Sequence, residues 1–119
     1  MKFKKLLMAA LFVTALSAGT AHSGDIGNGK ALFNDVNLGT NGKSCNTCHS
    51  GGKDIDGSKN TFKILGSEQE GIEDAANFCI EMALNGKPLE KGSAKMKALA
   101  SYLRTLRGKK EIENETPGY

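Results

Sequence analysis

Long apolar runs, aromatic side chains and proline are all scarce in this sequence of 119 residues, which contains no Trp, two Pro, five Phe and two Tyr. The longest run that is almost wholly apolar is Leu6 to Leu16, which is roughly half the ~20 residues that span a bilayer. A membrane anchor is therefore disfavoured. Three Lys at positions 2, 4 and 5 precede the run, and small residues follow it as far as Ser23. This layout predicts a secretory signal peptide over residues 1–23, cleaved after Ser23.

An excess of charge of one sign is also missing once the predicted signal peptide is removed. Three of the 16 Lys and Arg leave with it, and the remaining 13 match the 13 Asp and Glu, so the formal charge falls from +3 to about zero. That balance argues against a nucleic-acid-binding protein. The mature chain keeps one His, His49, and two Met, Met82 and Met96. So short an inventory limits the chemistry that the chain can perform.

Strand patterns are absent as well, and the sequence predicts an all-α domain over residues 24–110 with a flexible tail over 111–119. The first helix is expected over residues 27–36. A longer helix is expected from Ser67, with Glu70 as its capping-box partner, to about Leu84. Ser93 is the predicted N-cap of a last helix, in which apolar residues recur at helical spacing. Residues 50–60, rich in Gly, Asp and Lys, are expected to form a surface loop.

The strongest motif is Cys45-Asn46-Thr47-Cys48-His49. Two thiols at this spacing add across the two vinyl groups of a haem, and the adjacent His ligates the iron from the proximal side. A zinc site would need four ligands, and no second close pair of Cys or His exists in the mature chain. A redox-active Cys-x-x-Cys would need a thioredoxin-like pattern of strands and helices, and so close a spacing is poor for a disulfide. The motif therefore predicts one covalent haem c per chain.

A haem would also solve a second problem, because a mature chain this short with so few aromatic residues builds only a thin core. A large flat apolar cofactor gives the helices something to enclose. Without the haem we expect the mature chain to be marginally stable or unfolded.

The motif lies between a Gly-x-x-x-aromatic helix, with Gly29 and Phe33, and a final Ala-x-x-Tyr-Leu helix that contains Tyr102 and Leu103. In this arrangement the chain resembles the small class I cytochromes c over essentially its whole mature length. The resemblance implies a cytochrome c-like fold of three to four short helices wrapped around one covalent haem. It also implies that the first and last helices cross where Gly29 and Phe33 meet Tyr102 and Leu103.

The ligand on the other side of the iron has several candidates. His49 is the only His of the mature chain, so a bis-His centre is excluded if the signal peptide is removed. The class I family usually supplies a Met from the loop before the last helix, and residues 85–92 contain none. Met96 falls on the apolar stripe of the last helix, which favours a role in the core. Met82 and Cys79, on the preceding helix, remain the distal candidates.

A narrower resemblance concerns the segment that begins at Cys79 and continues through Met82, Asn85 and Gly86 to Tyr102. It is similar to a stretch in the haem domains of bacterial thiosulfate dehydrogenases and of sulfur-oxidising cytochromes with a Cys-ligated haem. In those families the Cys that matches Cys79 is the distal iron ligand, and an Arg three residues later helps to bind the sulfur anion. Here that position is Met82, and the sequence contains a single haem motif.

The expected function is that of an exported, periplasmic single-electron carrier, with other redox proteins as donor and acceptor and no catalytic residues. A monomer is expected, with a disulfide-linked dimer through Cys79 as an open alternative. A haem enzyme or enzyme subunit of sulfur oxidation is the second hypothesis, and a gas sensor with an open coordination site is the third. Four Lys close to the motif in sequence could form a docking patch, although a solvated loop is the simpler interpretation: Lys43, Lys53, Lys59 and Lys63.

Overall fold

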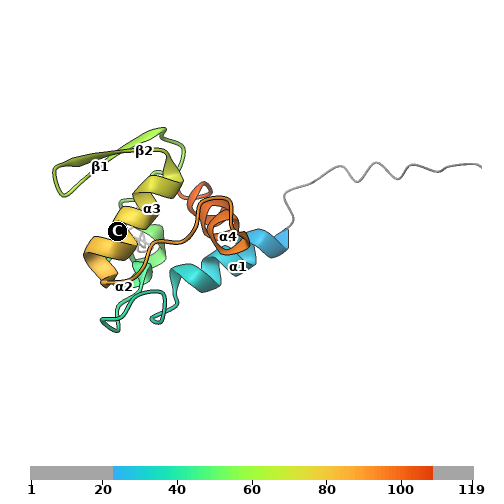
Figure 1. Ribbon diagram of the computed structural model, residues 1–119. Coiled ribbons are helices and arrows are strands. Elements are labelled where there is room, and N and C mark those ends of the chain that lie inside the picture. Colours follow the sequence, from blue (N-terminus) through green and yellow to red (C-terminus); the bar gives the residue numbers. More distant parts are fainter. Residues whose placement is uncertain (1–22, 109–119) are drawn as a thin grey trace, which may run out of the picture.

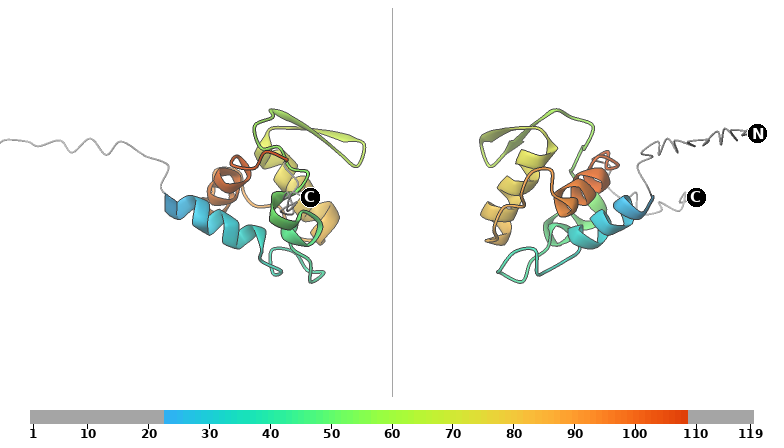
Figure 2. Two further views of the ribbon diagram at one scale, coloured as in Figure 1. Left: turned by 180° about the vertical axis from the view of Figure 1, so that it is seen from behind. Right: turned by 45° about the vertical axis from the view of Figure 1, so that its right-hand side comes forward.

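Four α-helices, one short 3-10 helix and a β-hairpin make up the part of the chain that the structure describes, residues 23–108 of a computed structural model (Figures 1 and 2). In chain order they are α1 (Ser23–Phe33), α2 (Cys45–Cys48), η1 (Ser50–Gly52), β1 (Thr61–Ile64), β2 (Ser67–Glu70), α3 (Ile72–Leu84) and α4 (Ala94–Leu103). Residues 1–22 of the predicted signal peptide and the predicted tail over 111–119 lie outside the described residues.

The first and last helices pack against each other more extensively than any other pair of elements, and they lie side by side in Figures 1 and 2. Gly29 makes the close approach possible, because a Cβ there would collide with the carbonyl oxygen of Ala98 and lie 2.7 Å from Cβ of Tyr102. The rings of Phe33 and Tyr102 meet edge to face with their centroids 5.2 Å apart. The predicted contact between these two helices is confirmed.

The predicted all-α class is wrong, because residues 61–70 form an antiparallel hairpin. Thr61 and Lys63 are exposed while Phe62 and Ile64 are half-buried, which is the alternation that a strand with one covered face requires. The register pairs Ile64 with Ser67, so the turn consists of Leu65 and Gly66 alone, and both have positive φ angles of 48° and 80°. Two-residue hairpin turns of the primed type need this backbone conformation. The fold is a mixed arrangement of four α-helices and a two-stranded sheet.

The helix expected from Ser67 to about Leu84 begins five residues later, at Ile72. Ser67 and Glu70 are the two ends of β2 and form no capping box at the start of α3. Gly71, at φ 88°, turns the chain from the strand into the helix. The end of α3 is close to the prediction, because Asn85 adopts the left-handed conformation that ends a helix.

The last helix begins where its cap predicts, since the Ser93 hydroxyl accepts a hydrogen bond from the backbone N–H of Met96 at 3.2 Å. It ends at Leu103, and the chain then returns to the segment after the haem motif. There Gly57 N–H donates to Leu106 O at 2.9 Å and Gly108 N–H donates to Ile55 O at 2.6 Å. The surface loop expected over residues 50–60 is therefore hydrogen-bonded to the segment that follows α4.

The hydrophobic core lies between α1, α3 and α4. None of the helices within residues 23–108 combines the length and the apolar character that a membrane span requires. The fully buried large side chains are Phe33, Ile80, Met96 and Leu99.

Candidate functional site

A cavity of about 490 Å³ opens beside this core and is bounded by α2, the loop that follows it, β1, α3 and α4. Its volume falls in the range of about 300–1,000 Å³ that is typical of small-molecule and cofactor sites. Most of its wall is apolar. The larger apolar side chains that line it are Phe33, Ile55, Phe62, Ile64, Ile72, Leu84, Leu99 and Leu103.

All three residues of the haem motif line this cavity: Cys45, Cys48 and His49. Cys45 and Cys48 are the two ends of α2, and His49 is its C-cap. At the start of the turn, Ser44 N–H donates to Thr47 Oγ1 at 2.9 Å. The turn closes when His49 N–H donates to Cys45 O at 2.9 Å. Local backbone bonding thus delivers two thiols and an imidazole to the same cavity.

The imidazole of His49 is held by a second contact, because its Nδ1 lies 2.8 Å from the backbone carbonyl oxygen of Lys53. A carbonyl oxygen can only accept, so Nδ1 carries the proton and donates it. In the neutral imidazole this tautomer leaves the lone pair on Nε2, the nitrogen that can bind a metal. A hydrogen bond of this kind at the other ring nitrogen is typical of metal-ligating His, since it fixes the tautomer and the ring orientation.

Cys79 lines the same cavity from α3. Burial, followed by the neighbouring Cys79, raises the pKa of the Cys45 thiol to about 11. Burial, followed by Cys48, raises the pKa of Cys79 as well. These mutual effects indicate that the three thiols face a shared space, and among the described residues all three are free of disulfides.

The two Met candidates lie elsewhere. Met82 is 63% exposed on the outer face of α3, and Met96 is fully buried in the core, where the apolar stripe predicted it. Neither lines the cavity, whereas Cys79 does. Of the two distal candidates, Cys79 and Met82, the structure brings only Cys79 to the wall of the haem-motif cavity.

The donor set of the site fits a covalent haem better than a bare metal ion. Within residues 23–108, no group of three or more His, Cys, Asp or Glu is arranged to hold a metal ion, so a zinc site made from the three Cys and His49 is disfavoured. A haem needs less from the protein, namely two thiols for attachment, one imidazole and an apolar enclosure. Cys45, Cys48 and His49 with the surrounding apolar wall supply all of these.

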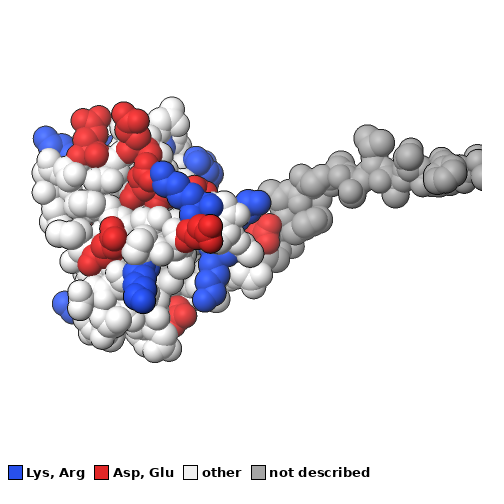
Figure 3. Space-filling model, viewed as in Figure 1, with Lys and Arg blue, Asp and Glu red and all other residues white. Residues whose placement is uncertain are grey.

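Charged side chains of both signs lie at the rim of the cavity. Lys59 and Lys63 line it together with Asp54 and Asp56, so the rim is not uniformly basic. Acidic and basic residues also intermingle on the face of the molecule in Figure 3. A continuous basic patch is not visible on that face.

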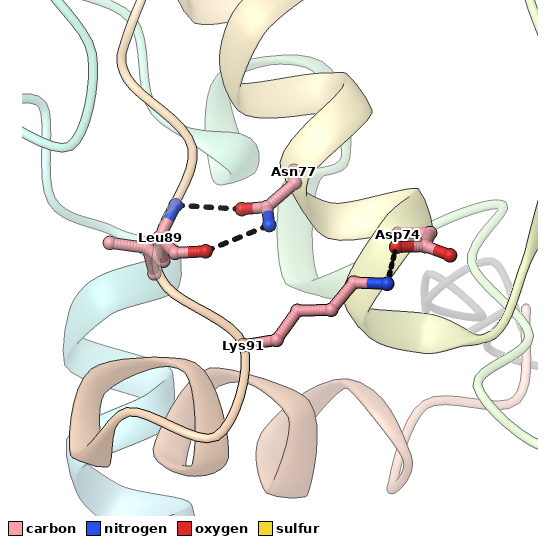
Figure 4. A network of polar contacts seen from close by, with 4 residues as sticks. All are labelled: Asp74, Asn77, Leu89 and Lys91. Carbon is pink, nitrogen blue, oxygen red and sulfur yellow. Dashed lines mark hydrogen bonds and ion pairs between the residues drawn. The ribbon is translucent and has the colours of Figure 1, made fainter.

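Two features of the site were missed by the sequence reasoning. The hairpin supplies one wall through Phe62 and Ile64, and the alternation of residues 61–64 was the signal that could have revealed it. The second feature is a half-buried polar contact between α3 and the loop before α4, where the side-chain amide of Asn77 bonds both backbone groups of Leu89 (Figure 4). Lys91 forms an ion pair with Asp74 beside it.

Comparison with protein-family models, curated proteins and solved structures finds no match to this chain. Functional inference therefore rests on the chemistry and geometry of the cavity.

Proposed function

We propose that this protein is an exported monohaem c-type cytochrome that carries single electrons between redox proteins of the periplasm. The observation that carries the proposal is the meeting of Cys45, Cys48, His49 and Cys79 in one apolar cavity of about 490 Å³. Haem, when bound, supplies an iron that accepts and releases one electron.

The residues around the cavity have separable roles in this proposal. Cys45 and Cys48 attach the ring through thioethers, each formed when a thiol S–H adds across a vinyl C=C bond, so no net electrons are exchanged with the protein. His49 offers Nε2 to the iron, because its Nδ1 proton is engaged by the Lys53 carbonyl. The apolar residues of α3, α4 and the hairpin exclude water, which helps to tune the potential.

Cys79 is the residue that we propose opposite His49. It is the sulfur ligand candidate that lines the cavity from α3, while Met82 points to solvent. Its raised pKa describes the thiol without a metal, and coordination to iron deprotonates a thiol. A thiolate ligand donates charge, stabilises ferric iron and lowers the potential relative to a neutral thioether.

The position of Cys79 at the cavity also supports a second candidate function, that of a haem enzyme or enzyme subunit of sulfur oxidation. Among the described residues that line the cavity the cations are Lys59 and Lys63, and Arg is absent from that lining. Steady-state turnover of thiosulfate with an artificial electron acceptor would favour the enzyme. Stoichiometric reduction of the haem without turnover would favour the carrier. The absence of Arg from the described residues that line the cavity also supports the carrier.

Haem attachment is tested by exporting the protein in a host with the machinery for c-type cytochrome maturation. The intact mass of the wild-type protein should exceed that of the mature chain by one haem, and a peptide containing Cys45 and Cys48 should carry it. Cys45→Ser with Cys48→Ser should abolish covalent haem, whereas Cys79→Ser is the matched control that retains it. A mature wild-type protein without haem under these conditions contradicts the proposal.

A further inference from the structure

Helix α3 carries two sulfur side chains, and its rotation about its own axis determines which of them faces the cavity. Cys79 and Met82 are three residues apart, which in an α-helix corresponds to about 60° around the axis and about 4.5 Å along it. Cys79 lines the cavity, and Met82 is 63% exposed. A screw movement of α3 by this amount would exchange the two, and it would also shift the buried side chains of Ile80 and Leu84.

Besides the buried apolar side chains of α3, a polar contact opposes such a movement. It is the Asn77–Leu89 pair, defined as the two hydrogen bonds between the Asn77 side chain and the Leu89 backbone (Figure 4). Asn77 Nδ2 donates to Leu89 O at 2.9 Å, and Leu89 N–H donates to Asn77 Oδ1 at 2.8 Å. Asn77 precedes Cys79 by two residues, so the two side chains leave α3 about 200° apart, on nearly opposite sides. The pair thus holds the outer side of the helix while Cys79 faces inward.

The geometry of the Asn77–Leu89 pair tolerates little movement. A side-chain amide that bonds both the N–H and the C=O of one residue must keep its position and its plane, and the site is half-buried, so water replaces lost bonds poorly. The loop that carries Leu89 leads directly into α4, which begins at Ala94.

We propose that Asn77 is a positioning residue that selects Cys79 over Met82 as the ligand opposite His49. The inference rests on the proposed haem function and adds to it a residue that touches neither the iron nor the ring. In physical terms, the Asn77–Leu89 pair lowers the free energy of the Cys79-facing orientation of α3 relative to the Met82-facing one, and so biases a two-state choice.

The test compares spectra of holo-proteins. In Asn77→Ala the Met-ligated fraction should rise by about tenfold or more, the order expected from losing two hydrogen bonds. The weak red absorption band of ferric Met-ligated haem should appear, the thiolate EPR signal should fall, and the reduction potential should rise. Adding Met82→Leu to Asn77→Ala should remove the new band, because the new ligand is then missing. Asn77→Asp, which keeps the acceptor for Leu89 N–H but not the donor, should give an intermediate spectrum.

Two controls separate positioning from a general loss of stability. Lys91→Ala removes the ion pair with Asp74 from the same loop, and Ser93→Ala removes the cap of α4. Both should leave the thiolate-ligated spectrum unchanged even where the melting temperature falls.

The inference is overturned if the ligand spectrum is unchanged in both Asn77→Asp and Asn77→Ala. If Asn77→Ala fails to bind haem, the spectrum of Asn77→Asp alone decides. A band that persists when Met82→Leu is added also overturns it. Failure of the proposed function is distinguishable, because the wild-type protein would then lack haem or lack a thiolate ligand from the outset.

Discussion

At the scale of single residues, the site combines a fixed imidazole with thiols that burial keeps protonated. His49 receives its orientation from the Lys53 carbonyl at 2.8 Å, so the nitrogen that faces a metal is determined by a backbone contact four residues away. Cys45 and Cys79 sit in an environment that disfavours the thiolate. Binding to iron would make the thiolate the favoured form of Cys79. At Cys45, formation of a thioether would leave no thiol proton to titrate.

Replacing Cys79 by Ala in the holo-protein should change the ligand set and raise the reduction potential by on the order of 100 mV, because a charge-donating thiolate is lost. Spectropotentiometric titration measures the change. The matched control is Met82→Leu, which alters an exposed side chain outside the cavity and should leave both spectrum and potential unchanged. A potential that moves in Met82→Leu and stays constant in Cys79→Ala would reverse the assignment.

The raised pKa of Cys45 predicts a pH dependence in the folded chain before haem attachment. Only the thiolate reacts with iodoacetamide, and a pKa of about 11 leaves roughly one thiol in a thousand ionised at pH 8. The alkylation rate of Cys45, followed by peptide mass spectrometry, should increase about tenfold per pH unit from pH 8 to 10. In urea, where burial is lost, the rate should level off near the ordinary thiol pKa of 9.0. A folded-state rate that already levels off there would contradict the burial argument.

The grouping of Cys45, Cys48 and His49 at one cavity could be predicted from the sequence, because their spacing is a local property of the chain. The candidates Cys79 and Met82 were also visible. The choice between them was not, since it depends on the face that α3 presents to the cavity. That face depends on tertiary contacts of α3, among them the burial of Ile80 and Leu84 in the core, which no local pattern encodes.

At the scale of elements, the crossing of α1 and α4 brings Phe33, Leu99 and Leu103 to the cavity wall. Gly29 is buried at the point of closest approach, and Gly27, one half-turn earlier, has no atom within 4 Å of the position its Cβ would occupy. The two glycines of the same helix thus differ only in what surrounds them, which makes them a matched pair.

Gly29→Ala should lower the free energy of unfolding by about 3 kcal/mol, because the new methyl group forces the helices apart. Gly27→Ala should raise it by up to about 1 kcal/mol through helix propensity alone. Urea unfolding followed by circular dichroism measures both. Equal effects of the two substitutions would contradict the close packing at Gly29.

The hairpin is the element that the sequence analysis missed. Ser67 and Glu70 match a capping box, yet they precede a glycine, Gly71, with a positive φ that starts the helix only at Ile72. The strand pattern of residues 61–64 is only four residues long, and a short alternation competes poorly with a cap motif. The strand forms at this position because Phe62 and Ile64 pack over the cavity, which is a tertiary contact.

At the scale of the whole molecule, the cavity is large for so small a domain. In a haem-free variant the apolar wall of this cavity of about 490 Å³ would be left uncovered, so the variant would lack the hydrophobic stabilisation that a covering ring provides. The haem-free chain is therefore expected to be only marginally stable. In this account the cofactor is part of the hydrophobic core.

The double variant Cys45→Ser with Cys48→Ser should consequently melt at least about 15 °C below the holo-protein, equivalent to ~3 kcal/mol or more for a domain of this size. Thermal unfolding followed by far-ultraviolet circular dichroism measures the difference. The control is Cys79→Ser, which keeps the attached haem and should lose far less. Equal melting temperatures for haem-free and holo-protein would show that the ring is not a structural component.

The central claim, a haem held between the Cys45–His49 motif and Cys79, is tested most directly by the combined ultraviolet–visible and EPR spectrum of the purified wild-type protein. The expected spectrum is that of a low-spin, six-coordinate ferric haem with one imidazole and one thiolate ligand, without the weak red band of Met ligation. A spectrum without haem absorption, or a haem with the band of Met ligation, would contradict it.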